Sequence, residues 1–358
     1  MTPFRFTQPI PTLCRDGDSV LVLDQTRLPW RSEQRRLRTL DEAAEAIRAM
    51  WVRGAPLIGG TAAYGVALAL TADPGDDALE YALATLAATR PTAVNLHWAL
   101  ARMAAALRPL TPGARRAAAW DEAAAICADD VRCCAAIGAH GLPLLQAIAA
   151  VRGRVRVMTH CNAGWLATMG AGTALAPVYA AHLAGLAVEV TVSETRPRNQ
   201  GLLTAWELRE AGVPHRLIAD NAAGLLLARG EIDLVITGAD RIAANGDTAN
   251  KVGTYLKALA AREAGVPFYI AAPHSTLDFG CPDGDAIPIE DRGAAEVCNV
   301  RGAGTDGEPA ELRLAPDATA AANPAFDVTP ARFIAGIITE RGIAAADALA
   351  ALYPEDAQ

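Results

Sequence analysis

In the second half of the chain, short runs of Val, Ile and Leu alternate with longer stretches whose apolar residues recur at helical spacing. Short continuous apolar runs are typical of buried strands. We expect such strands at about residues 154–159, 187–192, 215–219, 232–237 and 267–272. Strands that alternate with helices form parallel sheets with helices packed against them. The pattern therefore predicts an α/β fold with a Rossmann-like parallel sheet in this part of the chain.

The first half of the chain is mainly helical by the same criterion, with a few short strand-like pieces near its start, such as Ser19–Asp24. Thr39-Leu40-Asp41-Glu42 is typical of a helix start. A run from 117 to 148 predicts a helical connection between two domains, with an interruption at Gly141 to Pro143. We expect a smaller, mainly helical N-terminal α+β domain with a few short antiparallel strands over residues 1–128, and a Rossmann-like catalytic domain over 129–358.

Three of the predicted strands end in clusters of polar residues, at 159–162, 193–201 and 237–251. In open parallel sheets, ligands bind in the crevice beyond the carboxyl ends of the strands. Loops that were merely solvated would not need to follow strand ends. We therefore expect the three clusters to converge on one crevice.

Cys161 lies in the first of these clusters, directly after the apolar residues Val155, Val157 and Met158. We expect the chain to turn there into a helix through Ala163-Gly164, and a thiol at a helix N-terminus is favoured as thiolate. The alternative is an inert core cysteine. The polar neighbours and the position at a strand end favour the reactive role.

Asp240 follows the apolar strand residues Val235 and Ile236 in the third cluster. Burial disfavours the charged form of a carboxyl group, so an aspartate in an apolar pocket at a strand end has a raised pKa and can act as a proton donor. The alternative is an aspartate that caps a helix.

Two segments of the first half predict anion binding. Arg53-Gly54-Ala55-Pro56 places an arginine and a glycine-bearing loop before a helix, and Arg90 also precedes one. Helix N-termini bind anions through free N–H groups. The alternative for Arg53–Pro56 is a capping turn alone. Lysine is nearly absent from the chain, so Lys251 inside a polar motif is a further candidate cation.

Composition excludes several classes of function. The formal net charge of −8 argues against a nucleic-acid surface, which needs clustered Lys and Arg. The long uncharged stretches 54–72 and 157–188 contain Pro, Gly, His or Asn, which suit a buried α/β core better than a membrane span. We expect no membrane association.

The seven cysteines form an odd set, and the cluster of Cys127, Cys133 and Cys134 lacks the paired spacing of a zinc site. We find no signal-peptide pattern and expect a reducing, cytoplasmic location. Gly170-Ala171-Gly172 lacks the third glycine of a dinucleotide motif, and no P-loop lysine motif occurs. The residues predict neither a metal nor a nucleotide cofactor.

Eight motifs distributed over nearly the whole chain resemble the signatures of the methylthioribose-1-phosphate isomerase family. They are LDQTRLP (23–29), RGAPLIG (53–59), RPTAVNL (90–96), THCNAG (159–164), ETRPRNQG (194–201), GADRIAANGD (238–247), NKVGTY (250–255) and NPAFDVTP (323–330). The wider superfamily includes ribose-1,5-bisphosphate isomerase and the regulatory subunits of the eukaryotic initiation-factor exchange complex, which share the fold without catalysis.

The resemblance implies an aldose–ketose isomerisation of 5-methylthioribose 1-phosphate to 5-methylthioribulose 1-phosphate in methionine salvage, by a homodimer with no metal or organic cofactor. It implies Asp240 as the proton donor. Cys161 either removes the C2 proton, which is the preferred route, or stabilises the transition state of a hydride transfer. The substrate-binding residues implied by the resemblance are Arg53, Gly54, Ala55, Arg90, Gln200, Asn250 and Lys251.

Alternatives remain at this stage. The substrate could be 5-deoxyribose 1-phosphate or ribose 1,5-bisphosphate. A non-catalytic phosphosugar- or nucleotide-sensing subunit of the same fold is a second class of function, but Cys161 and Asp240 are both present, which disfavours it. Arg196 and Arg241 either bind substrate or pair with Glu194 or Asp247.

Overall fold

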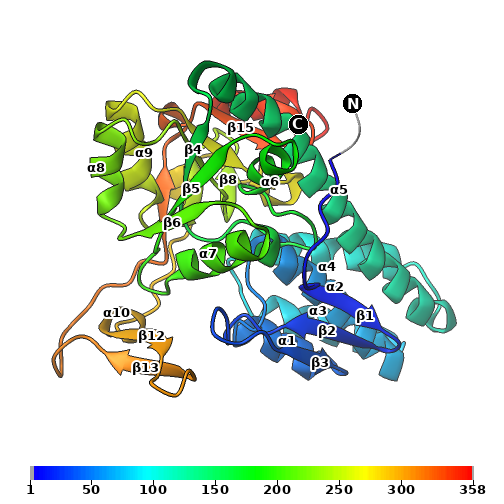
Figure 1. The fold of residues 1–358 in the computed structure, drawn as a ribbon. Coiled ribbons are helices and arrows are strands. Elements are labelled where there is room, and N and C mark those ends of the chain that lie inside the picture. The colour runs from blue at the N-terminus through cyan, green and yellow to red at the C-terminus, as the bar shows by residue number, and fades with distance from the viewer. Residues whose placement is uncertain (1–3, 357–358) are drawn as a thin grey trace.

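The computed structural model describes residues 4–356. Its N-terminal part packs four helices with a small antiparallel sheet, in blue and cyan in Figure 1. Thr39 caps the first helix through a reciprocal capping box with Glu42, as the sequence pattern predicts. The elements are β1 (Leu13–Asp16), β2 (Ser19–Leu23), β3 (Gln34–Leu37), α1 (Leu40–Arg48), α2 (Ala55–Ala72), α3 (Asp76–Ala87) and α4 (Val94–Leu107).

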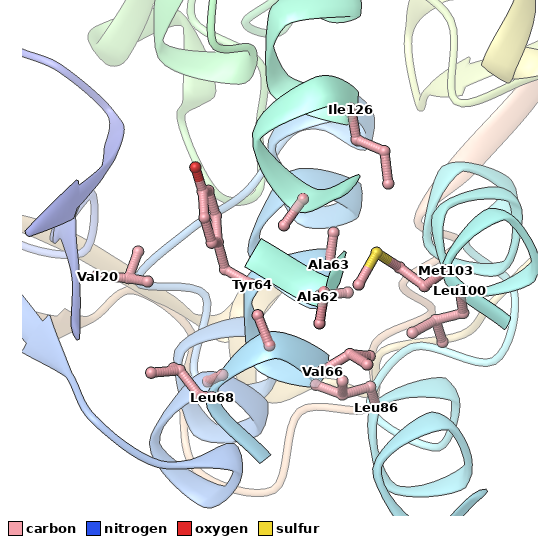
Figure 2. Packing of buried hydrophobic residues seen from close by; sticks show 14 of the residues in the cluster. Val20, Ala62, Ala63, Tyr64, Val66, Leu68, Leu86, Leu100, Met103 and Ile126 are labelled. Carbon is pink, nitrogen blue, oxygen red and sulfur yellow. The ribbon is translucent and has the colours of Figure 1, made fainter. Parts of the chain in front are cut away.

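Helix α2 is the centre of this part of the molecule. It is apolar on nearly every side, and its buried residues pack among Leu86, Leu100, Met103 and Ile126 (Figure 2). Close approach to α4 depends on Gly59, because a Cβ there would lie 2.9 Å from the carbonyl oxygen of Asn95. A helix that is hydrophobic all round must be covered by protein, and α2 is covered here.

Helix α5 (Pro112–Arg152) is continuous, so the interruption expected at Gly141 to Pro143 is wrong. A proline inside a helix removes one hydrogen bond and crowds the preceding turn. Packing compensates for this cost: a Cβ at Gly141 would lie 2.4 Å from Pro177 of α6 (Ala176–Leu183), and His140 Nδ1 lies 2.9 Å from the carbonyl oxygen of Thr339. Tertiary contacts thus hold the helix through a position where local sequence predicts a break.

The boundary predicted between residues 128 and 129 falls inside α5. One buried cluster draws its members from Leu13 to Ile126, whereas two others come almost entirely from Cys134 onward. The division into two domains along this line stays a prediction.

The two longest helices are also long and apolar enough to cross a membrane, judged by length and composition only. The most apolar stretch of α2 is 72% buried inside the protein and that of α5 is 28% buried. Core helices of soluble proteins meet the same criterion, so this finding is weak evidence for a span.

A seven-stranded sheet forms the centre of the second half, in the order β16-β15-β10-β7-β4-β5-β6. All neighbours are parallel except β15 and β16, and all five strands predicted from the sequence are present. The strands are β4 (Val155–Thr159), β5 (Val188–Ser193), β6 (His215–Ile218), β7 (Leu234–Thr237), β10 (Phe268–Ala271), β15 (Gly336–Thr339) and β16 (Gly342–Ala344). Besides α6, the helices of this part are α7 (Gln200–Glu210), α8 (Ala222–Ala228) and α9 (Thr254–Glu263).

Two smaller sheets complete the fold. A mixed four-stranded sheet consists of β11 (Leu277–Asp278), β8 (Arg241–Ala243), β9 (Thr248–Lys251) and β14 (Phe326–Thr329). The hairpin of β12 (Asn299–Ala303) and β13 (Pro309–Arg313) follows the short helix α10 (Ala295–Cys298) and extends from the body of the molecule (Figure 1). Strands β8 and β9 were not predicted from the sequence, although their residues belong to the third polar cluster.

Candidate active site

One cavity brings together all nine residues singled out from the sequence, together with Arg198, Arg241 and Arg292. It lies where the carboxyl ends of β4 and β7 meet the N-terminus of α2, so both halves of the chain contribute to its wall. The convergence of the three polar clusters on one crevice is therefore observed, whereas the role of each residue stays a prediction. The nine are Arg53, Gly54, Ala55, Arg90, Cys161, Gln200, Asp240, Asn250 and Lys251.

Cys161 lies two residues after the end of β4, in a left-handed backbone conformation with φ of 64°. Its N–H donates to Thr195 Oγ1 at 2.8 Å, and its carbonyl oxygen accepts from Thr204 Oγ1 at 2.8 Å. These two side-chain contacts hold a conformation that a non-glycine residue rarely adopts.

The helix expected directly after Cys161 is absent. The chain instead forms a loop with one 3₁₀ turn at Trp165–Ala167, and α6 begins only at Ala176. The segment directly after Cys161 therefore offers no helix N-terminus to a thiolate. Burial raises the pKa of the Cys161 thiol, with Arg53 and Lys251 opposing the shift. The expected support of a thiolate by a directly following helix is therefore wrong, and the catalytic role of Cys161 stays a prediction.

Asp240 follows β7 and precedes β8, so the alternative of a helix cap is wrong. Its N–H donates to the carbonyl oxygen of Ala249 at 2.9 Å. Burial raises the pKa of the Asp240 carboxyl, in the direction the sequence predicts, while Lys251, Arg90 and Arg53 act against it. A carboxylic acid in this setting can retain a proton for donation.

A close backbone contact joins the loops that carry these two groups. A Cβ at Gly238 would lie 2.6 Å from the Cβ of Ala163. The loop after β7 therefore packs directly on the loop after β4. This contact brings Asp240 and Cys161 to the same wall of the cavity.

Cationic side chains greatly outnumber carboxylates in the cavity lining. Six cations and one carboxylate, Asp240, occur among the lining residues, the cations being Arg53, Arg90, Arg198, Arg241, Lys251 and Arg292. Burial and the neighbouring Arg292 lower the pKa of Lys251 to about 8, and burial followed by Arg292 lowers the pKa of Arg90. Such crowding of like charges is suited to a dianionic group such as a phosphate.

The Arg53–Pro56 segment forms the start of α2 and also lines the cavity, while its anion-binding role stays a prediction. Gly54, with φ of 94°, is the N-cap of α2, and Pro56 lies in the helix's first turn. A Cβ at Gly54 would lie 2.5 Å from Ala167, so only glycine allows this approach. The helix start thus opens into the cavity with its free N–H groups.

Gln200 and Asn250 supply polar groups without charge. Gln200 begins α7, and its Oε1 is buried with no hydrogen-bond partner. Asn250 Nδ2 donates to Thr254 Oγ1 at 3.0 Å. The unpartnered oxygen of Gln200 is a candidate acceptor for a sugar hydroxyl.

Comparison with known proteins identifies the family to which the chain belongs. The sequence model of the Initiation factor 2 subunit family matches residues 51–346. The methylthioribose-1-phosphate isomerase of Dechloromonas aromatica is 62% identical over 346 residues, which cover 96% of each chain. The chain belongs to the methylthioribose-1-phosphate isomerase family.

Solved structures extend the comparison. The 5-methylthioribose 1-phosphate isomerase of Pyrococcus horikoshii has a TM-score of 0.85 at 38% identity and covers 98% of this chain and 99% of its own. A structure described as translation initiation factor eIF-2B, subunit delta, from A. fulgidus has a TM-score of 0.80 at 35% identity, covering 97% and 99%. The isomerase family thus shares its α/β fold with initiation-factor subunits, as the sequence motifs indicate.

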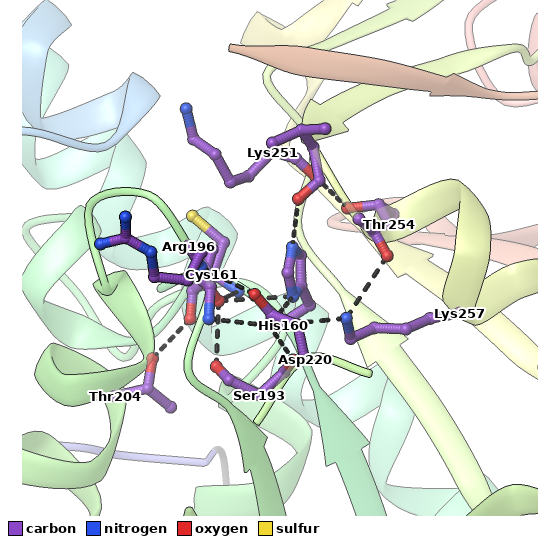
Figure 3. Close-up of polar contacts among 12 residues, drawn as sticks. His160, Cys161, Ser193, Arg196, Thr204, Asp220, Lys251, Thr254 and Lys257 are labelled. Carbon is purple, nitrogen blue, oxygen red and sulfur yellow. Dashed lines mark hydrogen bonds and ion pairs between the residues drawn. The ribbon is translucent and has the colours of Figure 1, made fainter. Parts of the chain in front are cut away.

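Behind Cys161, this member of the family has a polar network that joins the buried His160 to the partly buried Asp220 (Figure 3). His160 Nε2 donates to the carbonyl oxygen of Val252 at 2.9 Å, and its Nδ1 lies 3.3 Å from Thr195 Oγ1. Burial and the nearby Lys257 lower the pKa of His160 to about 3, so the ring is neutral at physiological pH. These contacts fix His160 between Val252 and Thr195, where it orients its neighbours.

Asp220 holds the second polar cluster in place. It accepts hydrogen bonds from the Ser193 hydroxyl, from the N–H of Thr195 at 2.8 Å and from the N–H of Arg196 at 2.7 Å. Lys257 Nζ lies 3.8 Å from the same carboxylate. Asp220 and Lys257 were not singled out from the sequence, because each lies outside the three strand-end clusters.

Arg196 and Arg241 do not pair with Glu194 or Asp247. Arg196 donates to the carbonyl oxygens of Pro197, Val297 and Asn299, which ties it to the β12–β13 hairpin. Arg241 lies 3.2 Å from Asp278 and donates to the carbonyl oxygen of Thr92, yet it also lines the cavity.

Two cavity arginines were missed by the sequence analysis. Arg198 lies within the ETRPRNQG motif, so the motif could have indicated it, and it donates to Glu296 Oε1 at 2.8 Å. Arg292 lies on a loop without a recognisable pattern. Its side chain is 9% exposed and its Nε is buried without a hydrogen-bond partner. That unpartnered donor beside Lys251 makes Arg292 a candidate ligand for the anion.

Proposed function

We propose that this chain converts 5-methylthioribose 1-phosphate to 5-methylthioribulose 1-phosphate, a step of methionine salvage. The observation that carries the proposal is that Asp240 and Cys161 line one cavity whose other charged groups are all cations. The family's relatives bear the name of this isomerase. The roles given to individual residues below are part of the proposal.

The phosphate on the anomeric oxygen determines the first step. Because that oxygen is blocked, the furanose ring opens with the phosphate attached, and the ring oxygen needs a proton when its bond to C1 breaks. Asp240 supplies this proton, and its raised pKa keeps the acid form available. The resulting carboxylate then accepts the proton of the C2 hydroxyl as that carbon becomes the ketone.

Hydrogen moves from C2 to C1 by one of two routes. In the first, a Cys161 thiolate removes the C2 proton and returns it to C1 of the enol phosphate. In the second, the hydrogen moves with its electron pair from C2 to C1, and Cys161 contacts the transition state. The raised pKa of the thiol supports the second route, because a buried neutral thiol is a weak base.

The cations and the start of α2 hold the phosphate in this proposal. Arg53, Arg90 and Lys251 neutralise its charge, and the guanidinium groups fit phosphate in a bidentate manner. Gly54 and Ala55 bring helix N–H groups to the same place. Gln200 and Asn250 bind sugar hydroxyls.

We also infer the finer features that accompany this function. The six parallel strands have the spatial order of a Rossmann-like doubly wound sheet, with the order reversing at β4. The division at residues 1–128 and 129–358, a homodimer, a cytoplasmic location and catalysis without metal or organic cofactor are proposals of the same kind. Among residues 4–356, no three His, Cys, Asp or Glu side chains are grouped for metal binding.

The test is turnover of 5-methylthioribose 1-phosphate in deuterated water, followed by NMR. The wild-type protein and a Cys14→Ala control, altered in β1 away from the cavity, should form the ketose 1-phosphate. Asp240→Asn and Cys161→Ala should lower kcat by about 10²- to 10⁴-fold, the usual contribution of acid–base catalysis.

The isotope pattern separates the two routes. Deuterium at C1 would establish proton transfer through an exchanging group, and C1 without deuterium supports hydride transfer. Turnover of ribose 1,5-bisphosphate or 5-deoxyribose 1-phosphate alone would replace the proposed substrate. Binding of these sugars without any turnover would overturn the enzyme proposal in favour of a sensing subunit.

A further inference from the structure

Glu207 on α7 is a carboxyl group that the proposed chemistry does not use. It is fully buried, with 0% of its surface exposed. Its Oε1 accepts from Asn162 Nδ2 at 2.7 Å, and its Oε2 accepts from the N–H of Leu166 at 3.0 Å. Within residues 4–356 it forms no ion pair at 4.0 Å or closer. A buried carboxyl group held only by neutral donors is costly to retain, which raises the question of what it does.

The contacts of Glu207 determine the orientation of Asn162. The Asn162 amide nitrogen donates to both Glu207 and Thr204 Oγ1, the latter at 3.0 Å. The amide oxygen therefore faces the other way, where it accepts from Arg53 Nη1. Arg53 Nη2 donates to the main-chain oxygen of Asn162 at 2.8 Å. Asn162 thus holds the Arg53 guanidinium at two points.

The same face of α7 also holds the loop that carries Cys161. Thr204 and Glu207 lie three residues apart and therefore project from the same side of the helix. Thr204 Oγ1 donates to the carbonyl oxygen of Cys161 at 2.8 Å. A Cβ at Gly164 would lie 1.9 Å from Glu207 Oε1, so the loop packs directly on the carboxyl group.

We propose that Glu207 is a positioning residue for phosphosugar binding: through Asn162 it fixes the Arg53 guanidinium toward the cavity, and with Thr204 it fixes the loop of Cys161. Glu207 is not among the residues that line the cavity. Arg53 is the residue through which its effect on binding is transmitted. The identity of the ligand in this inference rests on the proposed function. The contacts from Glu207 through Asn162 to Arg53 are independent of it.

Titration does not provide a selective test. Burial raises the pKa of Glu207 to about 8, with the donated hydrogen bonds and Arg53 opposing it, and Tyr179 is the other titratable group that faces it. The pKa of Lys251 is lowered to about 8 as well. The pH dependence of KM would therefore contain contributions from both Glu207 and Lys251. A double-mutant cycle separates the effect of Glu207.

The cycle combines Glu207→Gln with Arg53→Gln. Glutamine preserves volume but presents an N–H₂ group where two donors require acceptors. We expect Glu207→Gln alone to raise KM for the phosphosugar about 10-fold with a smaller change in kcat, corresponding to about 1.4 kcal/mol. In the Arg53→Gln background the same substitution should change KM by less than about 2-fold. An undiminished effect in that background would overturn the proposal.

A matched control separates positioning from general loss of stability. Asp233 is also a buried carboxylate, but it pairs with Arg156 at the opposite end of the central sheet. Asp233→Asn should lower the melting temperature and leave KM unchanged. An increase of KM in Asp233→Asn equal to that in Glu207→Gln would show that KM follows stability alone and would refute the positioning role.

Two further measurements keep the inference testable. If Glu207→Gln does not fold, Thr204→Val removes the second contact of Asn162 and should raise KM in the same manner, again with little additional effect after Arg53→Gln. Calorimetry with inorganic phosphate measures the cavity without requiring turnover. Weaker phosphate binding by Glu207→Gln would support the positioning role even if the wild type does not isomerise the phosphosugar, and unchanged binding would contradict it.

Discussion

At the scale of single residues, burial shifts the pKa values of the cavity's acid, thiol and lysine in the direction that favours the neutral form of each. The pKa values of Asp240 and Cys161 are raised, and the pKa of Lys251 is lowered. A dianionic ligand in this cavity favours the charged form of the lysine and so opposes the effect of burial on its pKa. This reciprocity makes ligand binding sensitive to the protonation of Lys251.

The first prediction concerns alkaline pH. Since the pKa of Lys251 is about 8, the amine is charged below that pH and loses its charge above it. Phosphosugar binding should therefore weaken as pH rises through about 8, seen as a rise in KM. Lys251→Arg should keep its charge and remove the contribution of Lys251 to this limb of the profile of kcat/KM against pH. If the alkaline fall in kcat/KM persists unchanged in Lys251→Arg, it arises from the titration of another group.

The second prediction concerns Arg292, whose positive charge lowers the pKa of Lys251 and whose Nε has no partner. Arg292→Gln should raise KM about 10- to 100-fold through loss of charge-assisted hydrogen bonds to the phosphate. It should also move the alkaline limb to higher pH, because Lys251 loses a repelling neighbour. Arg116→Gln, which removes an exposed arginine paired with Asp18, is the control and should change neither quantity. The measurement is KM as a function of pH for the wild type and both variants, and an unchanged KM in Arg292→Gln would contradict the prediction.

At the scale of elements, strands and helices that depend on local residue patterns can be predicted from the sequence. Loops whose conformation depends on contacts with distant residues cannot. Most of the five strands are rich in Val, Ile or Leu, and Cys161 and Asp240 could be found because each lies in the polar cluster that follows such a strand. The loop from Asn162 to Leu175 is different. Gln8 donates to the carbonyl oxygens of Trp165, Thr168 and Gly170, and Glu207 accepts from Leu166. No local pattern contains those partners, so a helix was expected where a tethered loop occurs.

Helix α5 gives the third prediction, at the same scale. Pro143 is exposed and interrupts the helix's hydrogen bonds, so Pro143→Ala should stabilise the protein by about 1–3 kcal/mol. Gly141→Ala, two residues away, should destabilise it by about 1–3 kcal/mol, because its Cβ would overlap Pro177. Gly113→Ala in the same helix has no atom within 4 Å of the added Cβ and is the control for helix propensity. Urea denaturation measures all three, and a stabilising Gly141→Ala would contradict the close packing of α5 on α6.

At the scale of the whole molecule, the cavity belongs to neither half of the chain alone. Arg53, Gly54 and Arg90 come from the helical N-terminal part, whereas Cys161, Asp240 and Lys251 come from the sheets of the second part. The motifs indicated each residue separately. The placing of α2 against the carboxyl ends of β4 and β7 depends on contacts between segments far apart in sequence, such as Arg53 with Asn162, and these could not be read from local spacing.

The fourth prediction follows from this shared cavity. A ligand that contacts both halves stabilises the native state of both, by about 2.7 kcal/mol at a concentration of 100 times Kd. Hydrogen exchange of peptides from α2 and from β7 should therefore slow together when the phosphosugar binds. Arg53→Gln should weaken the protection of both segments at a fixed ligand concentration, since binding itself is weakened, and restoring saturation should restore both. Protection of β7 without protection of α2 at saturation would show that the N-terminal part does not contribute to binding.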